Sequence, residues 1–281
     1  MSASTNITKQ SAVSFIVAGL LAVLAGGAFA ASKLTPDEAI RQLKVGNARY
    51  VSGKITHPRQ DSARRAEVSK GQNPFAVILS CSDSREPVEL LFDQGIGDLF
   101  VVRVAGNVAD TDEIGSIEYG AGHLGSPVVV VLGHTKCGAV TAVVKGEKVH
   151  GSIPALVDNI IPAAKKAKDA ARSRAKTEEI IEEAIKANVM QSIEDLFKKS
   201  SEVAELVEEK KLKVVGAVYN LDTGSIEWLG EHPDQSKLLK VGAKEEHGGK
   251  DEHKSGAKDE HKSGAKDEHK SGGKEERKTG H

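Results

Sequence analysis

The chain has 281 residues, a formal net charge of −1 at pH 7 and only 4% aromatic residues. Because positive and negative charges nearly balance, the composition does not support binding to nucleic acid or to an anionic membrane surface. The scarcity of aromatic side chains also argues against a stacking platform for bases. The chain is long enough to form one domain with a sizeable core.

The N-terminal segment is typical of a secretory signal peptide. Lys9 precedes an apolar run from Ala12 to Phe29, and the small residues Ala28 and Ala30 form a cleavage signature around Phe29. We therefore predict a signal peptide at residues 1–30 and a periplasmic or secreted mature protein that is free of the membrane. The run is nearly long enough to span a bilayer, so an uncleaved membrane anchor is the alternative.

Residues 31–242 alternate between amphipathic segments and short apolar runs. Thr35, Pro36 and Glu38 form the signature of a helix start, with a hydroxyl cap, a proline in the first turn and a glutamate that reaches back. Continuous β-prone runs, typical of strands covered on both faces, lie at 75–80, 99–104, 128–133 and 212–219, and an edge strand is predicted at 225–229. Helical patterns occupy 113–124, 137–145 and 153–211. This alternation predicts an α/β sheet with flanking helices.

Residues 243–281 form a low-complexity tail rich in Lys, Asp, Glu, His and Gly. From Lys244 onward no apolar residue is larger than alanine, so the tail cannot bury a core and we predict that it is disordered. Its histidines allow three interpretations. They are incidental solvated side chains, weak ligands for transition metals, or mobile carriers of protons.

Both cysteines of the chain lie at predicted element ends. Cys81 follows the run 75–80 and His134 follows the run 128–133, so both belong at the carboxyl edge of a parallel sheet. Cys137 begins the next helix, where main-chain N–H groups favour a thiolate. Two thiolates and one imidazole supply three zinc ligands and leave a fourth position open, as in catalytic zinc sites. In an oxidising compartment, a disulfide between the two cysteines is the alternative.

These residues stand in a longer pattern of motifs. Cys-x-Asp-x-Arg begins at Cys81 and His-x-x-Cys begins at His134, and the segments LKVGNARYV, GDLFVVRVAGN, SIEYG and VVGAVYNLDTG surround them in order. Over about residues 34–229, the chain resembles the β-class carbonic anhydrases. The resemblance implies a central four-stranded parallel sheet with an antiparallel edge strand and an N-terminal helical arm. It also implies dimers in which neighbouring subunits complete each pocket, or dimers of dimers.

The resemblance assigns roles to the two motifs. Cys81, His134 and Cys137 are implied as the ligands of one Zn²⁺ per subunit, and Asp83 with Arg85 as the catalytic pair. In an open state, Asp83 accepts a hydrogen bond from zinc-bound hydroxide while it is paired with Arg85. In a closed state, Asp83 binds the metal and displaces the water. An ordinary surface Asp–Arg pair is the alternative.

A substrate pocket for carbon dioxide and bicarbonate is implied by five further positions. Gln72 matches a glutamine that hydrogen-bonds bicarbonate, Phe100 and Tyr119 match aromatic pocket residues, and Gly138 matches the glycine beside the last ligand. Ala105 stands where family members place a bulkier aliphatic residue, so we expect a somewhat wider pocket. Ordinary core packing is the alternative for Phe100 and Tyr119.

The implied reaction is the zinc-dependent, reversible hydration of carbon dioxide to bicarbonate and a proton. The family also contains hydrolases of carbonyl sulfide and carbon disulfide with the same ligands, and these reactions are the alternative within the enzyme class. A zinc-storage or metal-delivery protein that uses the His-rich tail is the alternative from another class. Storage would require neither Gln72 nor the Asp83–Arg85 pair, so the enzyme is the favoured interpretation.

Overall fold

The computed structural model describes residues 34–245 and the side chains up to residue 240. The predicted signal peptide and nearly all of the predicted tail lie outside the described residues. Helix α1 (Pro36–Val51) begins as predicted, because Thr35 and Glu38 cap each other's main-chain N–H groups in a capping box. Helix α2 (Ser62–Val68) follows, capped by the Asp61 side chain. These two helices form the predicted N-terminal helical arm.

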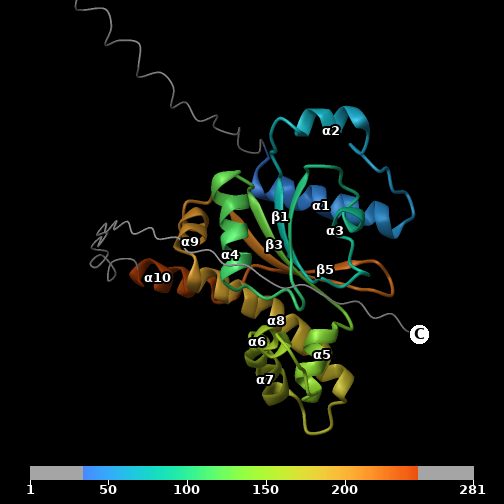
Figure 1. Ribbon diagram of the computed structural model, residues 1–281. Coiled ribbons are helices and arrows are strands. Elements are labelled where there is room, and N and C mark those ends of the chain that lie inside the picture. Colours follow the sequence, from blue (N-terminus) through green and yellow to red (C-terminus); the bar gives the residue numbers. More distant parts are fainter. Residues whose placement is uncertain (1–33, 246–281) are drawn as a thin grey trace, which may run out of the picture. The chain divides into compact units, whose positions relative to one another are not determined.

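The centre of the structure is a five-stranded sheet in the order β2-β1-β3-β4-β5 (Figure 1). The strands are β1 (Ala76–Ser80), β2 (Leu99–Arg103), β3 (Val128–His134), β4 (Lys213–Tyr219) and β5 (Ile226–Gly230). The first four pair in parallel, and β5 pairs antiparallel with β4. Four parallel strands and an antiparallel edge strand confirm the predicted fold class.

The helical regions are more divided than the sequence pattern predicted. They are α3 (Val88–Leu91), α4 (Thr111–Glu118), the π-helix η1 (Tyr119–His123), α5 (Gly138–Lys145), α6 (Ile153–Asp158), α7 (Ile161–Ala170), α8 (Thr177–Lys199), α9 (Ser201–Glu208) and α10 (Gln235–Glu245). The predicted helical region 153–211 is divided into the four helices α6 to α9, because Pro154 and Pro162 start new helices and the Ser200 side chain caps α9. Helix α10 also runs past the predicted boundary at residue 242. Within residues 34–245, no helix is both long and apolar enough to cross a bilayer.

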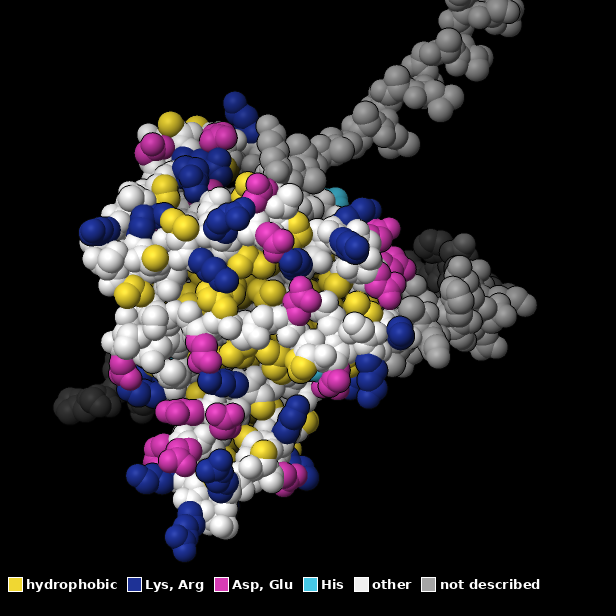
Figure 2. Space-filling model, turned by 180° about the vertical axis from the view of Figure 1, so that it is seen from behind, with side chains coloured by type: hydrophobic (Ala, Val, Ile, Leu, Met, Phe, Trp, Pro, Cys, Tyr) yellow, Lys and Arg dark blue, Asp and Glu magenta, His cyan; other side chains and the backbone are white. Residues whose placement is uncertain are grey.

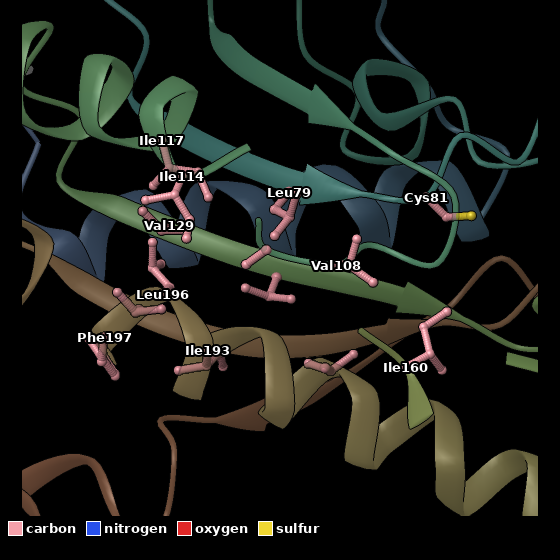
Figure 3. Close-up of a cluster of buried hydrophobic side chains, with 14 of the residues drawn as sticks. Leu79, Cys81, Val108, Ile114, Ile117, Val129, Ile160, Ile193, Leu196 and Phe197 are labelled. Atoms are coloured by element: carbon pink, nitrogen blue, oxygen red, sulfur yellow. The ribbon is translucent and has the colours of Figure 1, made fainter. Parts of the chain in front are cut away.

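The three inner strands β1, β3 and β4 are buried on both faces, whereas the outer strands β2 and β5 are half-buried, although the run 99–104 was predicted to be covered on both faces. On one face, Leu43 of α1 joins Ile78 and Val130 in an apolar cluster. On the other face, α8 and α4 cover the strands, and Figure 3 shows side chains such as Ile193 and Ile117 packed in this layer. Cys81 lies at one end of the same layer, beyond the carboxyl end of β1. The fold therefore delivers Cys81 and His134 to one edge of the sheet, as predicted.

Candidate metal centre

Three potential metal ligands gather at the carboxyl edge of the sheet. Cys81 directly follows β1, His134 ends β3, and Cys137 is the N-cap residue of α5. Their sulfur and nitrogen atoms all lie within 4.8 Å of one another, and all three residues are buried. Both cysteines are free thiols. The structure thus brings together the three residues that the sequence predicts as ligands, without the alternative disulfide.

A short turn between β3 and α5 sets the relative position of two of these ligands. The N–H of Thr135 donates to the carbonyl of Tyr219 at 2.9 Å, and the Thr135 hydroxyl accepts from the N–H of Leu221 at 3.0 Å. Lys136 then adopts a φ of 58°, in the left-handed region, which turns the chain back toward the cluster. The turn is therefore fastened to the end of β4, and it presents His134 and Cys137 side by side.

The hydrogen bond of His134 fixes which ring nitrogen is available. Its Nδ1 lies 2.9 Å from the carbonyl oxygen of Thr135, and a carbonyl oxygen can only accept, so Nδ1 carries the hydrogen. Nε2 then has a free lone pair, and it is a buried atom without a hydrogen-bond partner in the described residues. A buried lone pair that faces two sulfur atoms fits a metal ion. The donor set of two sulfurs and one nitrogen is one that zinc takes.

The two thiols differ in acidity because they share one buried site. The hydrogen bond from Cys137, with a further one from the N–H of Gly106 at 3.2 Å, lowers the pKa of Cys81 well below the usual range. The hydrogen bond to Cys81, burial and the Cys81 charge raise the pKa of Cys137. The helix start opposes this rise through main-chain N–H groups of α5, but in the absence of a metal it does not overcome it. Cys81 is therefore the first thiol to ionise.

The backbone at Gly106 does not accommodate a side chain. Its φ is +76°, and a Cβ at this position would lie 2.6 Å from Cδ1 of Ile160. A side chain would therefore be strained and crowded, and it would move the N–H that donates to Cys81.

Asp83 and Arg85 form a close pair beside the cluster. Asp83 Oδ1 accepts from Nε of Arg85 at 2.9 Å, and Oδ2 accepts from Nη2 at 2.7 Å. These hydrogen bonds from Arg85 hold the pKa of Asp83 well below its ordinary value. Asp83 Oδ2 also lies 3.7 Å from Nε2 of His134. A carboxylate that remains ionised at neutral pH thus borders the cluster, where it can accept a hydrogen bond.

The comparisons with known proteins agree with this geometry. The family model described as "Carbonic anhydrase" matches residues 76–226. The carbonic anhydrase of Mycolicibacterium smegmatis is 39% identical over 196 residues, which cover 68% of this chain and 92% of the relative. The crystal structure of the β-carbonic anhydrase CafA of Aspergillus fumigatus aligns with a TM-score of 0.60 at 26% identity, over 74% of this chain and 97% of that one. The chain belongs to the β-class carbonic anhydrase family. It is thus an enzyme of the lyase class.

Two other similarities extend the comparison. Carbonic anhydrase 2 of Mycobacterium tuberculosis is 39% identical over 193 residues, which cover 67% of this chain and 90% of the relative. One of two tetrameric β-carbonic anhydrases of Sordaria macrospora aligns with a TM-score of 0.54 at 25% identity, over 65% of this chain and 91% of that one. The likeness therefore covers nearly the whole length of these relatives.

Two of the five predicted pocket residues lie beside the ligand cluster. Ala105 is half-buried and directly precedes Gly106, whose N–H contacts the sulfur of Cys81. Gly138 directly follows Cys137, and a Cβ built on it would have no neighbour within 4 Å. Space is therefore open beside Cys137 at this position.

The other three predicted pocket residues lie at the amino end of the same sheet. Phe100 pairs with Val77 near the start of β1, and its ring lies 5.9 Å from that of Tyr119, centroid to centroid. Gln72 precedes β1 and is exposed. Because a five-residue strand spans about 17 Å, these side chains and Cys81 lie at opposite ends of the sheet. A single chain does not bring the five residues together.

Sequence reasoning missed three residues that support the site. Arg103, at the end of β2, donates to the carbonyl of Cys81 at 2.9 Å and to that of Asp83 at 2.6 Å. Asn188, a buried amide on the core side of α8, donates to the carbonyl of Gly106 at 2.7 Å. For Arg103 and Asn188, the available signal was a polar residue within an apolar run. Glu86, the third, is fully buried next to Cys81, and burial raises its pKa to about 8.

Proposed function

We propose that the chain catalyses the reversible hydration of carbon dioxide to bicarbonate and a proton, with one Zn²⁺ ion held by Cys81, His134 and Cys137. The observation that carries the proposal is the buried cluster of three ligand atoms, of which His134 Nε2 has no partner in the described part of the chain. Two sulfur donors and one imidazole nitrogen match the ligands of zinc in proteins. A bound zinc ion supplies Lewis acidity, which brings the pKa of a water molecule toward neutrality.

Asp83 and Arg85 orient the reacting water in this proposal. The Asp83 carboxylate accepts a hydrogen bond from the water and directs the remaining lone pair toward the substrate. Arg85 engages both carboxylate oxygens, so it restrains Asp83 from turning toward the fourth ligand position. The closed state predicted from the sequence would therefore require Arg85 to release Asp83.

A second copy of the chain completes the pocket in this proposal. Gln72, Phe100 and Tyr119 lie away from the ligand cluster of their own chain, and Tyr119 is 44% exposed. An exposed aromatic residue is typical of interaction surfaces. The α1 side chains Val45 and Val51 are exposed as well. Figure 2 shows that apolar side chains also gather among charged side chains of both signs on the face seen from behind. The tetrameric enzymes of Sordaria macrospora support self-association.

Export and the role of the tail are proposals that rest on the sequence. We propose that residues 1–30 direct the chain to the periplasm or the exterior, and that the histidines of residues 243–281 assist proton transfer to buffer. Deletion of residues 244–281 should then slow turnover in weak buffer and leave it unchanged in strong buffer. Equal turnover of the full-length and shortened proteins in weak buffer would dismiss the tail proposal.

Stopped-flow measurement of carbon dioxide hydration tests the main proposal. The mature protein should be measured at pH about 8, where a catalytic zinc site holds deprotonated water, before and after zinc removal by a chelator. We expect the rate to fall to the uncatalysed level and to return when zinc is added. A rate that does not depend on zinc would contradict the proposal.

A further inference from the structure

The turn after β1 carries two acidic residues in opposite environments. Asp83 accepts hydrogen bonds from Arg85, whereas Glu86 is fully buried. Glu86 Oε2 accepts from the main-chain N–H of Cys81 at 3.1 Å, and Oε1 has no hydrogen-bond partner in the described residues. No cationic side chain of residues 34–240 lies within ion-pair distance of Glu86. A carboxyl group in this position is costly to bury, so its retention calls for a physical reason.

The position of the Cys81 main chain supplies that reason. Strand β1 ends at Ser80, so the N–H of Cys81 needs an acceptor outside the strand, and Glu86 provides it. The Glu86 N–H donates to the carbonyl of Asp83 at 3.0 Å, which closes the turn and brings the side chain back beneath Cys81. Arg103 holds the carbonyl of Cys81 from the other side. The sulfur atom is therefore aimed by contacts on both sides of its own residue.

We propose that Glu86 is a positioning residue of the metal centre. Its Oε2 atom fixes the main chain of Cys81 and so directs the sulfur of Cys81 toward His134 and Cys137. The inference rests on the proposed metal site and adds to it a residue outside the ligand set. Groups that hold metal ligands in place typically contribute about 10- to 100-fold to metal affinity.

Cobalt(II) is the probe for this inference, because its absorption reports both the coordination geometry and the bond to thiolate. Affinity is measured by competition with a chelator on the full chain. Glu86→Gln keeps an acceptor oxygen at the same reach, so we expect its affinity within about 3-fold of the unmodified protein and the same spectrum. Glu86→Leu has similar volume and no acceptor, and we expect at least roughly 10-fold weaker binding and an altered thiolate band.

A matched control separates positioning from general stability. Ser126→Ala removes another buried hydrogen bond, from the Ser126 hydroxyl to the carbonyl of Pro74 at 2.8 Å. This bond lies beyond the amino end of β1, so we expect lower thermal stability and unchanged cobalt affinity. If Glu86→Leu does not fold, Glu86→Asp takes its place, because the shorter side chain withdraws its oxygen from Cys81 and should weaken binding similarly.

Each outcome bears on one proposal or the other. Wild-type affinity in Glu86→Leu or Glu86→Asp would overturn the positioning role, as would equal losses in Glu86→Gln and Glu86→Asp. Failure of the unmodified protein to bind cobalt or zinc would instead overturn the metal centre itself. The expected result is tight binding by the unmodified protein and Glu86→Gln, with weak binding by Glu86→Leu, which lacks the acceptor, or by Glu86→Asp, which withdraws it from Cys81.

Discussion

At the carboxyl end of the central sheet, the three potential ligands are buried and already lie within 4.8 Å of one another. At the amino end, Gln72 and Tyr119 face solvent, and Phe100 packs against Tyr119 alone among the described aromatic rings. One chain therefore has its three potential metal ligands in place, whereas three of the predicted pocket residues lie apart from them. In the proposed function, each subunit holds its own metal ion, and two subunits together form the substrate pocket.

The two ends differ for a physical reason. A buried cluster of thiols and imidazole needs partners for its polar atoms inside the protein, since unpaired polar groups are costly there. Thr135, Gly106 and Arg103 supply hydrogen bonds at the carboxyl end. Nε2 of His134, which has no partner in the described residues, is left for the proposed metal ion. Exposed polar side chains at the amino end are hydrogen-bonded to water in the single chain. They therefore do not incur the free-energy cost of an unpaired buried group before a second copy binds.

The largest effect is expected from Cys137→Ser. A serine hydroxyl is a poor zinc ligand, so zinc content should fall and the hydration rate should drop by at least roughly 1,000-fold. Metal analysis and stopped-flow kinetics check both results. His150→Ala, which removes an exposed histidine, is the control and should change neither. Normal zinc content in Cys137→Ser would contradict the proposed metal centre, because the zinc site would then lie elsewhere.

Asp83→Asn should cause the next largest effect. The amide keeps the shape of the side chain but loses the charge, so we expect about a 100-fold lower rate with normal zinc content. Because the pKa of Asp83 lies below its ordinary value, the residue stays ionised on the alkaline side and through neutral pH. Its titration should therefore cause no loss of activity between pH about 8 and 6. Asp169→Asn, from an exposed Asp–Lys pair on α7, is the control. Zinc loss in Asp83→Asn would assign Asp83 to the metal and not to the water.

Much of the fold could be predicted because local sequence patterns determine it. Continuous apolar runs mark the four parallel strands, although β2 is a half-buried edge strand, and Thr35 with Glu38 marks the start of α1. The positions of two ligands followed from strand order, since Cys81 directly follows one parallel strand and His134 is the last residue of another. The helix breaks in 153–211 were partly accessible, because Pro154 and Pro162 mark helix starts. The break at Ser200 was less accessible, because it depends on a side-chain cap in a polar stretch.

The parts of the site that could not be predicted depend on contacts that no local pattern shows. Glu86 turns inward only because its own N–H closes a turn onto Asp83, and Asn188 reaches Gly106 across the interface of α8 with the sheet. The resemblance named Gln72 and Phe100 as pocket residues, but the end of the sheet on which they lie became evident only from the register of β1 and β2.

Gln72→Ala tests whether the amino end serves the pocket. Loss of one hydrogen bond to substrate should lower the hydration rate roughly 10-fold with normal zinc content, whereas Gln60→Ala, at another exposed glutamine, should have no effect. A mixture of Gln72→Ala and Cys137→Ser chains sharpens the test. If the pocket spans two subunits, each hybrid dimer has one intact site, so random mixing should restore about a quarter of the wild-type activity. Activity no greater than the average of the two parents would show that Gln72 acts within its own chain or not at all.

The smallest effect concerns the acid stability of the N-terminal arm. Burial raises the pKa of Asp93, but hydrogen bonds from Arg49, Thr56 and His57 outweigh it and lower the pKa to about 2. The stabilisation is therefore fully present above pH about 4 and is lost as the pH falls toward 2. Arg49→Gln should raise the pKa of folded Asp93 and reduce the free energy of unfolding by about 1 kcal/mol at pH 7, with the difference shrinking in acid. Arg65→Gln, at an exposed cation of α2, is the control for urea unfolding curves at several pH values. A difference that stays constant down to pH about 2 would show that Arg49 stabilises the arm through packing and not through the Asp93 carboxylate.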